Sequence, residues 1–159
     1  MVKFIKEFLK ESEWISSNLD INKISLIVKL IKECKKKNGR IFFLGVGGSA
    51  GNASHAVNDF RKIVGIEAYA PTDNVSELTA RVNDEGWSEI FVKWLETSKL
   101  NKKDMIFIFS VGGGNIKKNI SVNLIKAIKL AKKKNSKIIS IVGKKNGYAA
   151  KNSNVSLII

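Results

Sequence analysis

The residues best suited to chemistry lie in a glycine-rich turn in the first third of the chain. The run from Gly45 to Ser49 contains three glycines and a hydroxyl, and it follows a short apolar segment. Glycines let backbone N–H groups approach an anion, the N-terminus of a following helix adds positive potential, and the Ser49 hydroxyl adds a donor. The turn therefore predicts a phosphate site that uses Gly47, Gly48 and Ser49.

Two other interpretations of these glycines stay open. The dinucleotide-binding pattern G-x-G-x-x-G/A is also satisfied, by Gly45, Gly47 and Ala50. The acidic residue that such a site places at the end of the next strand is missing, because Tyr69-Ala70-Pro71 stands there. We therefore expect no nucleotide cofactor. The third interpretation is a purely structural turn.

The only histidine lies shortly after this turn. Four residues separate His55 from Asp59, so on a helix the two side chains share one face. An imidazole and a carboxylate at this spacing can ligate one divalent metal, or one can polarise a carbonyl while the other moves a proton. Alternatively, the two side chains hydrogen-bond each other or solvent.

A second glycine run, from Ser110 to Asn115, follows another apolar segment. It again places glycines and a hydroxyl where we expect the carboxyl end of a strand. The two turns could enclose one phosphate ester, and the further contacts would come from Ser110, Gly112, Gly113 and Ser121. The alternative is that the glycines form a flexible connection.

A polar cluster surrounds the single proline, Pro71. Asp73 or Ser76 could cap a helix there. Further on, Asn83 and Asp84 could end that helix or contact sugar hydroxyls.

The lengths of the apolar segments predict an α/β fold. Two segments with helical spacing open the chain, residues 3–18 and 21–37, the second with Asp20 at its start and Gly39 at its end. Strand-length runs follow at Ile41–Leu44, Met105–Phe109, Ile138–Val142 and Val155–Ile159, with a shorter one at 66–70. Helix-length segments lie between them, at 52–63, 75–82, 88–98 and 118–134. Such alternation predicts a parallel sheet covered by helices.

The composition is basic, with 28 Lys and Arg against 14 Asp and Glu and a formal charge of +14. Such a charge attracts phosphates in general, nucleic acid included. The densest lysine runs fall at expected helix C-termini, where cations offset the helix dipole, and no aromatic residues are interleaved with them. We therefore do not expect nucleic acid as a partner.

The chain shows no signal-peptide pattern, and no apolar run approaches the ~20 residues that span a bilayer. Its single cysteine, Cys34, cannot form a disulfide within the chain. A cytoplasmic protein is the expectation.

Taken together, the motifs resemble the sugar isomerase (SIS) domain family, in particular its phosphoheptose isomerases. The Gly45–Ser49 turn, the helix with His55 and Asp59, the Asn83-Asp84 pair and the Ser110 loop occur in the order seen there. The resemblance covers nearly the whole chain. It implies one three-layer SIS domain over 1–159, with a five-stranded parallel sheet in 39–159. The N-terminal helices in 1–38 would help to build a homotetramer with sites between subunits.

The resemblance also implies an activity. That family converts sedoheptulose 7-phosphate to D-glycero-D-manno-heptose 7-phosphate through an enediol, for lipopolysaccharide or capsule heptose, and its members often bind zinc. By position, His55 matches a metal ligand, and Asp59 matches a glutamate that serves as ligand and acid/base. Ser49 and Ser110 match phosphate-binding serines, and Asp84 matches an active-site aspartate.

Three departures from the family pattern stand out. Asp59 is one methylene shorter than the expected glutamate. Val46 replaces a usual asparagine, and the Ser110 loop has glycines in place of further hydroxyls. The family's last helix, with a glutamine and a catalytic histidine, has no counterpart before Ile159. We therefore expect either an enzyme whose sequence is C-terminally incomplete here, or a non-catalytic SIS module that binds a sugar phosphate or a protein partner, as relatives that associate with the replication initiator do.

Overall fold

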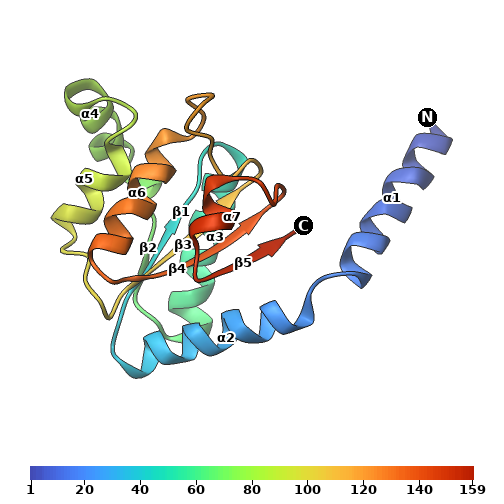
Figure 1. Cartoon of the computed structure of the whole chain (residues 1–159), viewed down its shortest axis with the longest axis horizontal. Coiled ribbons are helices and arrows are strands. Elements are labelled where there is room, and N and C mark those ends of the chain that lie inside the picture. Colours follow the sequence, from blue (N-terminus) through green and yellow to red (C-terminus); the bar gives the residue numbers. More distant parts are fainter.

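The computed structural model describes all 159 residues and is built around a five-stranded sheet (Figure 1). The strands are β1 (Ile41–Leu44), β2 (Ala68–Tyr69), β3 (Met105–Ser110), β4 (Lys137–Val142) and β5 (Val155–Ile158). Their order is β2-β1-β3-β4-β5, and every neighbouring pair is parallel. The predicted parallel α/β class is confirmed, and so are all five predicted strands.

Helices cover both faces of the sheet. The seven α-helices of the chain are α1 (Val2–Ser17), which lies away from the sheet, α2 (Ile21–Lys36), α3 (Gly48–Asp59), α4 (Val75–Glu85), α5 (Ile90–Thr97), α6 (Val122–Lys133) and α7 (Tyr148–Asn152). A π-helical turn, Phe60–Val64, prolongs α3, and a 3-10 turn, Pro71–Asp73, follows β2.

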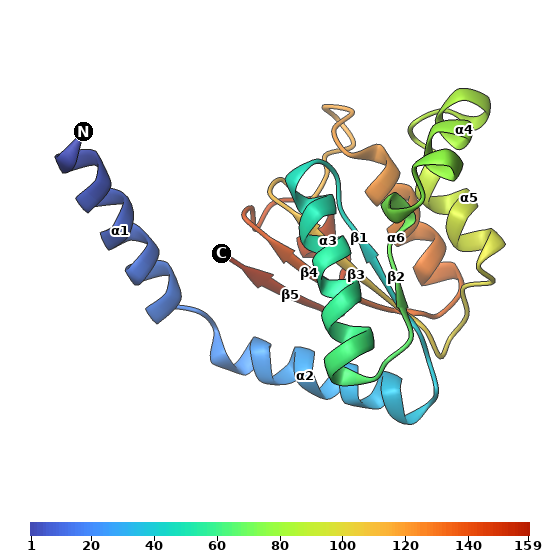
Figure 2. The same ribbon diagram turned by 180° about the vertical axis from the view of Figure 1, so that it is seen from behind.

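The sheet carries a separate core on each face because successive strand residues point to opposite sides. Phe42 and Leu44 of β1 pack with buried residues of α5, α6 and α7. Ile41 and Phe43 pack on the other face with buried residues of α2 and α3. Figure 2 shows α3 on one side of the sheet and α5 and α6 on the other. The three-layer architecture is confirmed.

The elements differ from the predictions where local contacts set their ends. The helix predicted from residue 52 already begins at Gly48, and the one predicted from 118 begins at Val122. Residues 115–120 instead form a hairpin, which two backbone hydrogen bonds between Asn115 and Ile120 close at 2.9 and 3.0 Å. The five-residue α7 was not predicted, because it is too short to show helical periodicity.

The predicted caps of α2 are half right. Asp20 accepts a 3.0 Å hydrogen bond from the N–H of Lys23, as a helix N-cap does. Gly39 does not end the helix, because Asn38 takes the left-handed conformation, with φ of 51°. Gly39 is instead required for close packing, since a Cβ there would lie 2.0 Å from the carbonyl oxygen of Lys103. For α4, the cap is Asn74, which accepts from the N–H of Glu77 at 3.3 Å, and neither Asp73 nor Ser76.

A buried ion pair ties the amino ends of β1 and β3 together. Asp104 is only 2% exposed and accepts hydrogen bonds from Arg40 N, Nε and Nη2 at 3.0, 3.2 and 2.8 Å. Asn101 adds two more. The hydrogen bond to Asp104 is the chief cause that raises the pKa of Arg40. This cluster lies at the amino ends of the strands, whereas the glycine turns lie at their carboxyl ends.

The first helix stands apart from the body of the molecule (Figures 1 and 2). No residue of α1 is buried, and Phe4, Phe8 and Trp14 are 70%, 59% and 66% exposed. None of the helices is long and apolar enough to cross a membrane.

Candidate functional site

The strand order creates a topological switch point between β1 and β3. After β1 the chain enters α3 on one face, and after β3 it enters α6 on the other face. Parallel α/β proteins bind ligands at the carboxyl ends of the strands that flank such a point. Both glycine runs found in the sequence lie there, one after each strand.

The first glycine turn closes tightly onto the start of α3. A Cβ on Gly45 would lie 2.2 Å from the carbonyl oxygen of Ser49, so only glycine fits. Gly47 has a φ of 60°, in the left-handed region. The N–H groups of Val46 and Gly47 donate to no acceptor within the chain. Together with the helix N-terminus they remain available to an anion.

The second glycine loop is internally bonded. The N–H of Gly113 donates a 3.0 Å hydrogen bond to Ser110 Oγ, so the serine hydroxyl accepts from its own loop and keeps its proton free to donate. The N–H of Gly112 has no acceptor in the chain. Two glycines of this loop were predicted to contact substrate. Gly112 has a free N–H donor, whereas the N–H of Gly113 is used to position Ser110.

This loop is also pinned to the connection between β4 and α7. Gly143 N–H of that connection donates to the carbonyl of Val111 at 3.0 Å, and two N–H groups in the first turn of α7 donate to the carbonyls of Gly113 and Gly114 at 2.8 and 2.9 Å. Gly147 packs so closely that a Cβ there would lie 2.4 Å from the carbonyl oxygen of Gly112. The loop is thus held by tertiary contacts, and a freely flexible connection does not describe it.

The two turns border a common hollow. Ser49 and Asn52 of α3 and Ser110 of β3 line an open space of about 250 Å³ at the carboxyl ends of the strands. The other lining residues are Phe109, Val111, Ile141, Val142, Gly143 and Ile159. The structure thus brings together the two serines predicted to bind phosphate. Asn52 was not predicted, although its position three residues after Ser49 places it on the same helix side.

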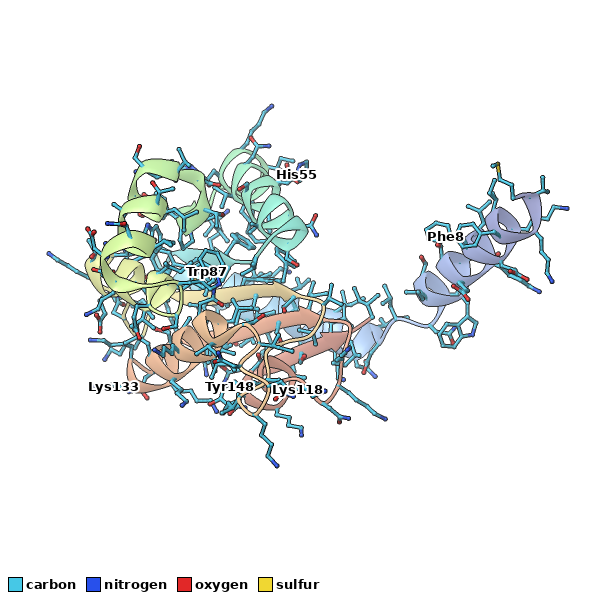
Figure 3. The ribbon with its side chains drawn as sticks, turned by 90° about the horizontal axis from the view of Figure 1, so that it is seen from above. Phe8, His55, Trp87, Lys118, Lys133 and Tyr148 are labelled. Carbon is cyan, nitrogen blue, oxygen red and sulfur yellow. The ribbon has the colours of Figure 1, made fainter.

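His55 and Asp59 continue this polar side of α3. Ser49, Asn52, His55 and Asp59 follow one another at steps of three, three and four residues. His55 Nε2 lies 3.2 Å from Asp59 Oδ2, and the two side chains are 78% and 41% exposed. Asn58 Nδ2 donates to Asp59 Oδ1 at 3.2 Å. The predicted pairing on one helix face is present, and His55 points outward from this chain (Figure 3).

This pair by itself does not make a zinc site. Zinc in proteins takes four ligands, or three with a water. His55 and Asp59 supply two, and no third His, Cys, Asp or Glu joins them in a metal-binding group.

Three residues predicted to contact substrate lie away from the hollow within this chain. Asn83 and Asp84 are exposed at the end of α4, where Asn83 Nδ2 donates to Asp84 Oδ1 at 2.7 Å. Ser121 precedes α6 in a left-handed conformation, and its hydroxyl caps nothing. None of the three lines the hollow. Asp73, the first acidic residue after β2, accepts a hydrogen bond from the Ser54 hydroxyl.

The fold and the hollow define a parallel α/β protein whose polar ligand site sits at a switch point. Residues 4–143 match the family model described as the SIS domain. The chain belongs to the SIS domain family and is of the phosphoheptose isomerase type.

The relatives extend over nearly the full chain. The phosphoheptose isomerase of Helicobacter pylori strain P12 is 31% identical over 163 residues, which cover 97% of this chain and 80% of the relative. That of Sulfurimonas denitrificans is 32% identical over 169 residues, covering 100% and 83%.

Solved structures agree with this fold. The phosphoheptose isomerase of Neisseria gonorrhoeae superposes with a TM-score of 0.82 at 25% identity, covering 98% of this chain and 81% of that one. The enzyme of Francisella tularensis gives a TM-score of 0.85 at 22% identity, covering 98% and 83%.

Proposed function

We propose that this protein is a phosphosugar isomerase that interconverts sedoheptulose 7-phosphate and D-glycero-D-manno-heptose 7-phosphate. The observation that carries the proposal is the single hollow that holds both Ser49 and Ser110 at the switch point of the sheet. Relatives of this chain named phosphoheptose isomerase support the substrate class. The product would supply heptose for lipopolysaccharide or capsule, made in the cytoplasm.

The hollow would hold the phosphate ester. Ser49 and Ser110 would donate from their hydroxyls, and Gly47, Gly48 and Gly112 from their backbone N–H groups. Gly113 would orient Ser110 through its 3.0 Å hydrogen bond. Because the Val46 side chain offers no hydrogen-bond donor in this turn, backbone N–H groups would contribute more of the binding to phosphate.

The reaction requires one carbon-bound proton to move. A base removes a proton from C1 of the ketose and the C2 carbonyl oxygen gains a proton, which gives an enediol. Proton return to C2 and loss of the O1 proton then give the aldose. We assign the proton transfer to Asp59 and the polarisation of the carbonyl to His55, whose Nε2 lies 3.2 Å from the carboxylate.

The spacing along α3 supports a long substrate. Ten residues separate Ser49 from Asp59, a rise of roughly 15 Å along a helix axis. All side chains of α3 lean alike toward the helix N-terminus, so the His55–Asp59 pair stays separated along the helix from Ser49 at the hollow. In a heptose 7-phosphate, the phosphate and the reacting carbons stand at opposite ends of the sugar, as this arrangement requires. Asn52, between the two, would contact the sugar hydroxyls.

We further propose that the site is completed in a homotetramer. The exposed apolar residues of α1 supply a surface for assembly, and the outward-facing pair on α3 leaves room for a second subunit. Asn83, Asp84 and Ser121, remote from the hollow of their own chain, would then contact sugar in the assembled site. Zinc would need donors beyond this pair.

The test is conversion of sedoheptulose 7-phosphate by the protein expressed from its full native reading frame, with and without added zinc. Asp59→Asn is expected to abolish turnover. The matched control, Glu96→Gln, removes an exposed carboxylate of α5 paired only with Lys93 and is expected to leave turnover unchanged. Saturable binding of the sugar phosphate without turnover would instead identify a non-catalytic SIS module.

A further inference from the structure

The hollow contains no charged side chain. All nine residues that line it are neutral, and its polar groups are two hydroxyls and one amide. A sugar phosphate is a dianion near neutral pH, so the cationic charge that attracts it must come from outside the lining.

Two lysine pairs lie on the loops that leave the hollow. Gly143, a lining residue, is followed directly by Lys144 and Lys145. Val111, also a lining residue, leads into the 115–120 hairpin, which carries Lys117 and Lys118. The N–H of Gly143 donates to the carbonyl of Val111 at 3.0 Å, so the two loops start side by side.

Nothing in this part of the chain neutralises these lysines. No Asp or Glu occurs after Asp104, so β3, β4, β5 and their connections contain no carboxylate side chain. The only lysine of this region in an ion pair is Lys126, which binds Glu89 of the preceding segment. The four loop lysines are exposed and make no ion pair.

Their position does not suit helix stability. Lysines at a helix C-terminus offset the negative end of its dipole, as Lys132 and Lys133 do in α6. Lys117 and Lys118 instead precede the N-terminus of α6, the positive end of the dipole, where cations are unfavourable. A role in stabilising the fold therefore does not account for this pair.

We propose that Lys117, Lys118, Lys144 and Lys145 form a lysine rim that attracts the substrate's phosphate dianion and guides it into the hollow. The substrate part of this inference rests on the proposed function. The lysine ammonium is a compact, hydrated charge on a flexible stem, which suits capture at a rim. Convergent positive charge raises the association rate of an anion, and salt weakens this effect because it screens charges farther apart than a Debye length, about 8 Å at physiological ionic strength.

The experiment compares three double variants: K117Q/K118Q, K144Q/K145Q and the control K133Q/K134Q. The control removes the same charge at the far end of α6, and Figure 3 shows Lys133 well separated from Lys118. The first readout is kcat/KM for the sugar phosphate at increasing sodium chloride. Each rim variant should lose roughly 3- to 10-fold in kcat/KM at low salt, with kcat nearly unchanged and a flatter salt dependence. The control should behave like the wild type.

The second readout needs no turnover. Inorganic phosphate, compared with chloride at equal ionic strength, should raise the Tm of the wild type and of the control, and raise it less in both rim variants. If the wild type turns over sugar phosphate and the rim variants behave like the control variant, the proposed role of the lysine rim is wrong. The proposed isomerase activity would then still hold. Absence of turnover together with a rim-dependent phosphate shift would overturn the isomerase and keep the rim. If inorganic phosphate does not change the Tm of the wild type, the proposed lysine rim is wrong.

Discussion

Gly113 donates its backbone N–H to Ser110 Oγ at 3.0 Å, across a glycine loop that is itself bonded to the β4–α7 connection. This contact turns a mobile hydroxyl into an oriented donor, because its oxygen is occupied and its proton points elsewhere. The connection between β4 and α7 therefore helps to position the Ser110 loop through hydrogen bonds to its backbone.

The first prediction concerns Ser110. Ser110→Ala removes a donor to the phosphate and the acceptor for Gly113, so KM should rise about 10-fold. The stability loss should stay near 1 kcal/mol, since one partly buried hydrogen bond is lost. Steady-state kinetics and urea unfolding measure the two effects. Ser16→Ala, at an exposed helix position in α1, is the control. An unchanged KM in Ser110→Ala would remove this serine from the site.

The second prediction separates two glycines of the first turn. Gly45→Ala should cost about 1–3 kcal/mol, because its Cβ would meet the carbonyl oxygen of Ser49 at 2.2 Å. Gly48→Ala has open space around its Cβ and should change unfolding by less than about 0.5 kcal/mol. It should nevertheless raise KM, because the proposed phosphate site uses the backbone N–H of Gly48 and an added methyl group would crowd the close approach of the anion. Equal stability of the two variants would contradict the close approach at Gly45.

The third prediction concerns the buried ion pair of Arg40 and Asp104 at the amino ends of β1 and β3. Asp104→Ala leaves Arg40 without its carboxylate partner, and breaking a buried pair in this way costs about 3–5 kcal/mol. The change should appear as a lower urea midpoint. Asp20→Ala removes only a helix cap and should cost about 1 kcal/mol. A cost for Asp104→Ala no larger than that of the cap would show that the pair does not hold β1 and β3 together.

The fourth prediction concerns Cys34. Burial raises the pKa of this thiol to about 11, since its sulfur lies against the carbonyl groups of Arg40 and Lys103. The folded state therefore keeps its proton longer than the unfolded state, whose thiol has a pKa of about 8.5. The resulting stability is present below the unfolded pKa and is lost as pH rises toward 11. The Cys34→Ala variant should not show this loss of folding stability between about pH 8.5 and about pH 11.

The same burial protects the thiol from reagents. Alkylation by iodoacetamide at pH 8 should proceed only through unfolding, so its rate should rise with urea in step with the unfolded fraction. Rapid labelling of the native protein would contradict the buried placement of Cys34.

The fifth prediction tests the assembly surface. Phe8 is 59% exposed on a helix that buries no residue of its own chain. If α1 joins subunits, Phe8→Asp should lower the oligomer mass measured by light scattering, with the far-UV CD spectrum unchanged. Lys10→Asp, on the same helix, controls for the introduced charge. An unaltered mass would assign assembly to another surface.

Much of this protein could be predicted from local sequence. Strands buried on both faces appear as short apolar runs, and glycine turns mark where they end, because both features depend on neighbouring residues alone. The steps from Ser49 to His55 and Asp59 likewise place these side chains on one helix side without knowledge of the fold.

The tertiary structure decided which of these features meet. Strand order depends on pairing between segments far apart in sequence, and only that order places the Gly45 and Ser110 turns on either side of one switch point. The tertiary structure also brought Asn52 into the hollow, left Asn83 and Asp84 outside it, and bonded Gly113 to the first turn of α7. The sequence alone thus specified the chemical groups of the site, whereas long-range pairing and packing determined their arrangement around a ligand.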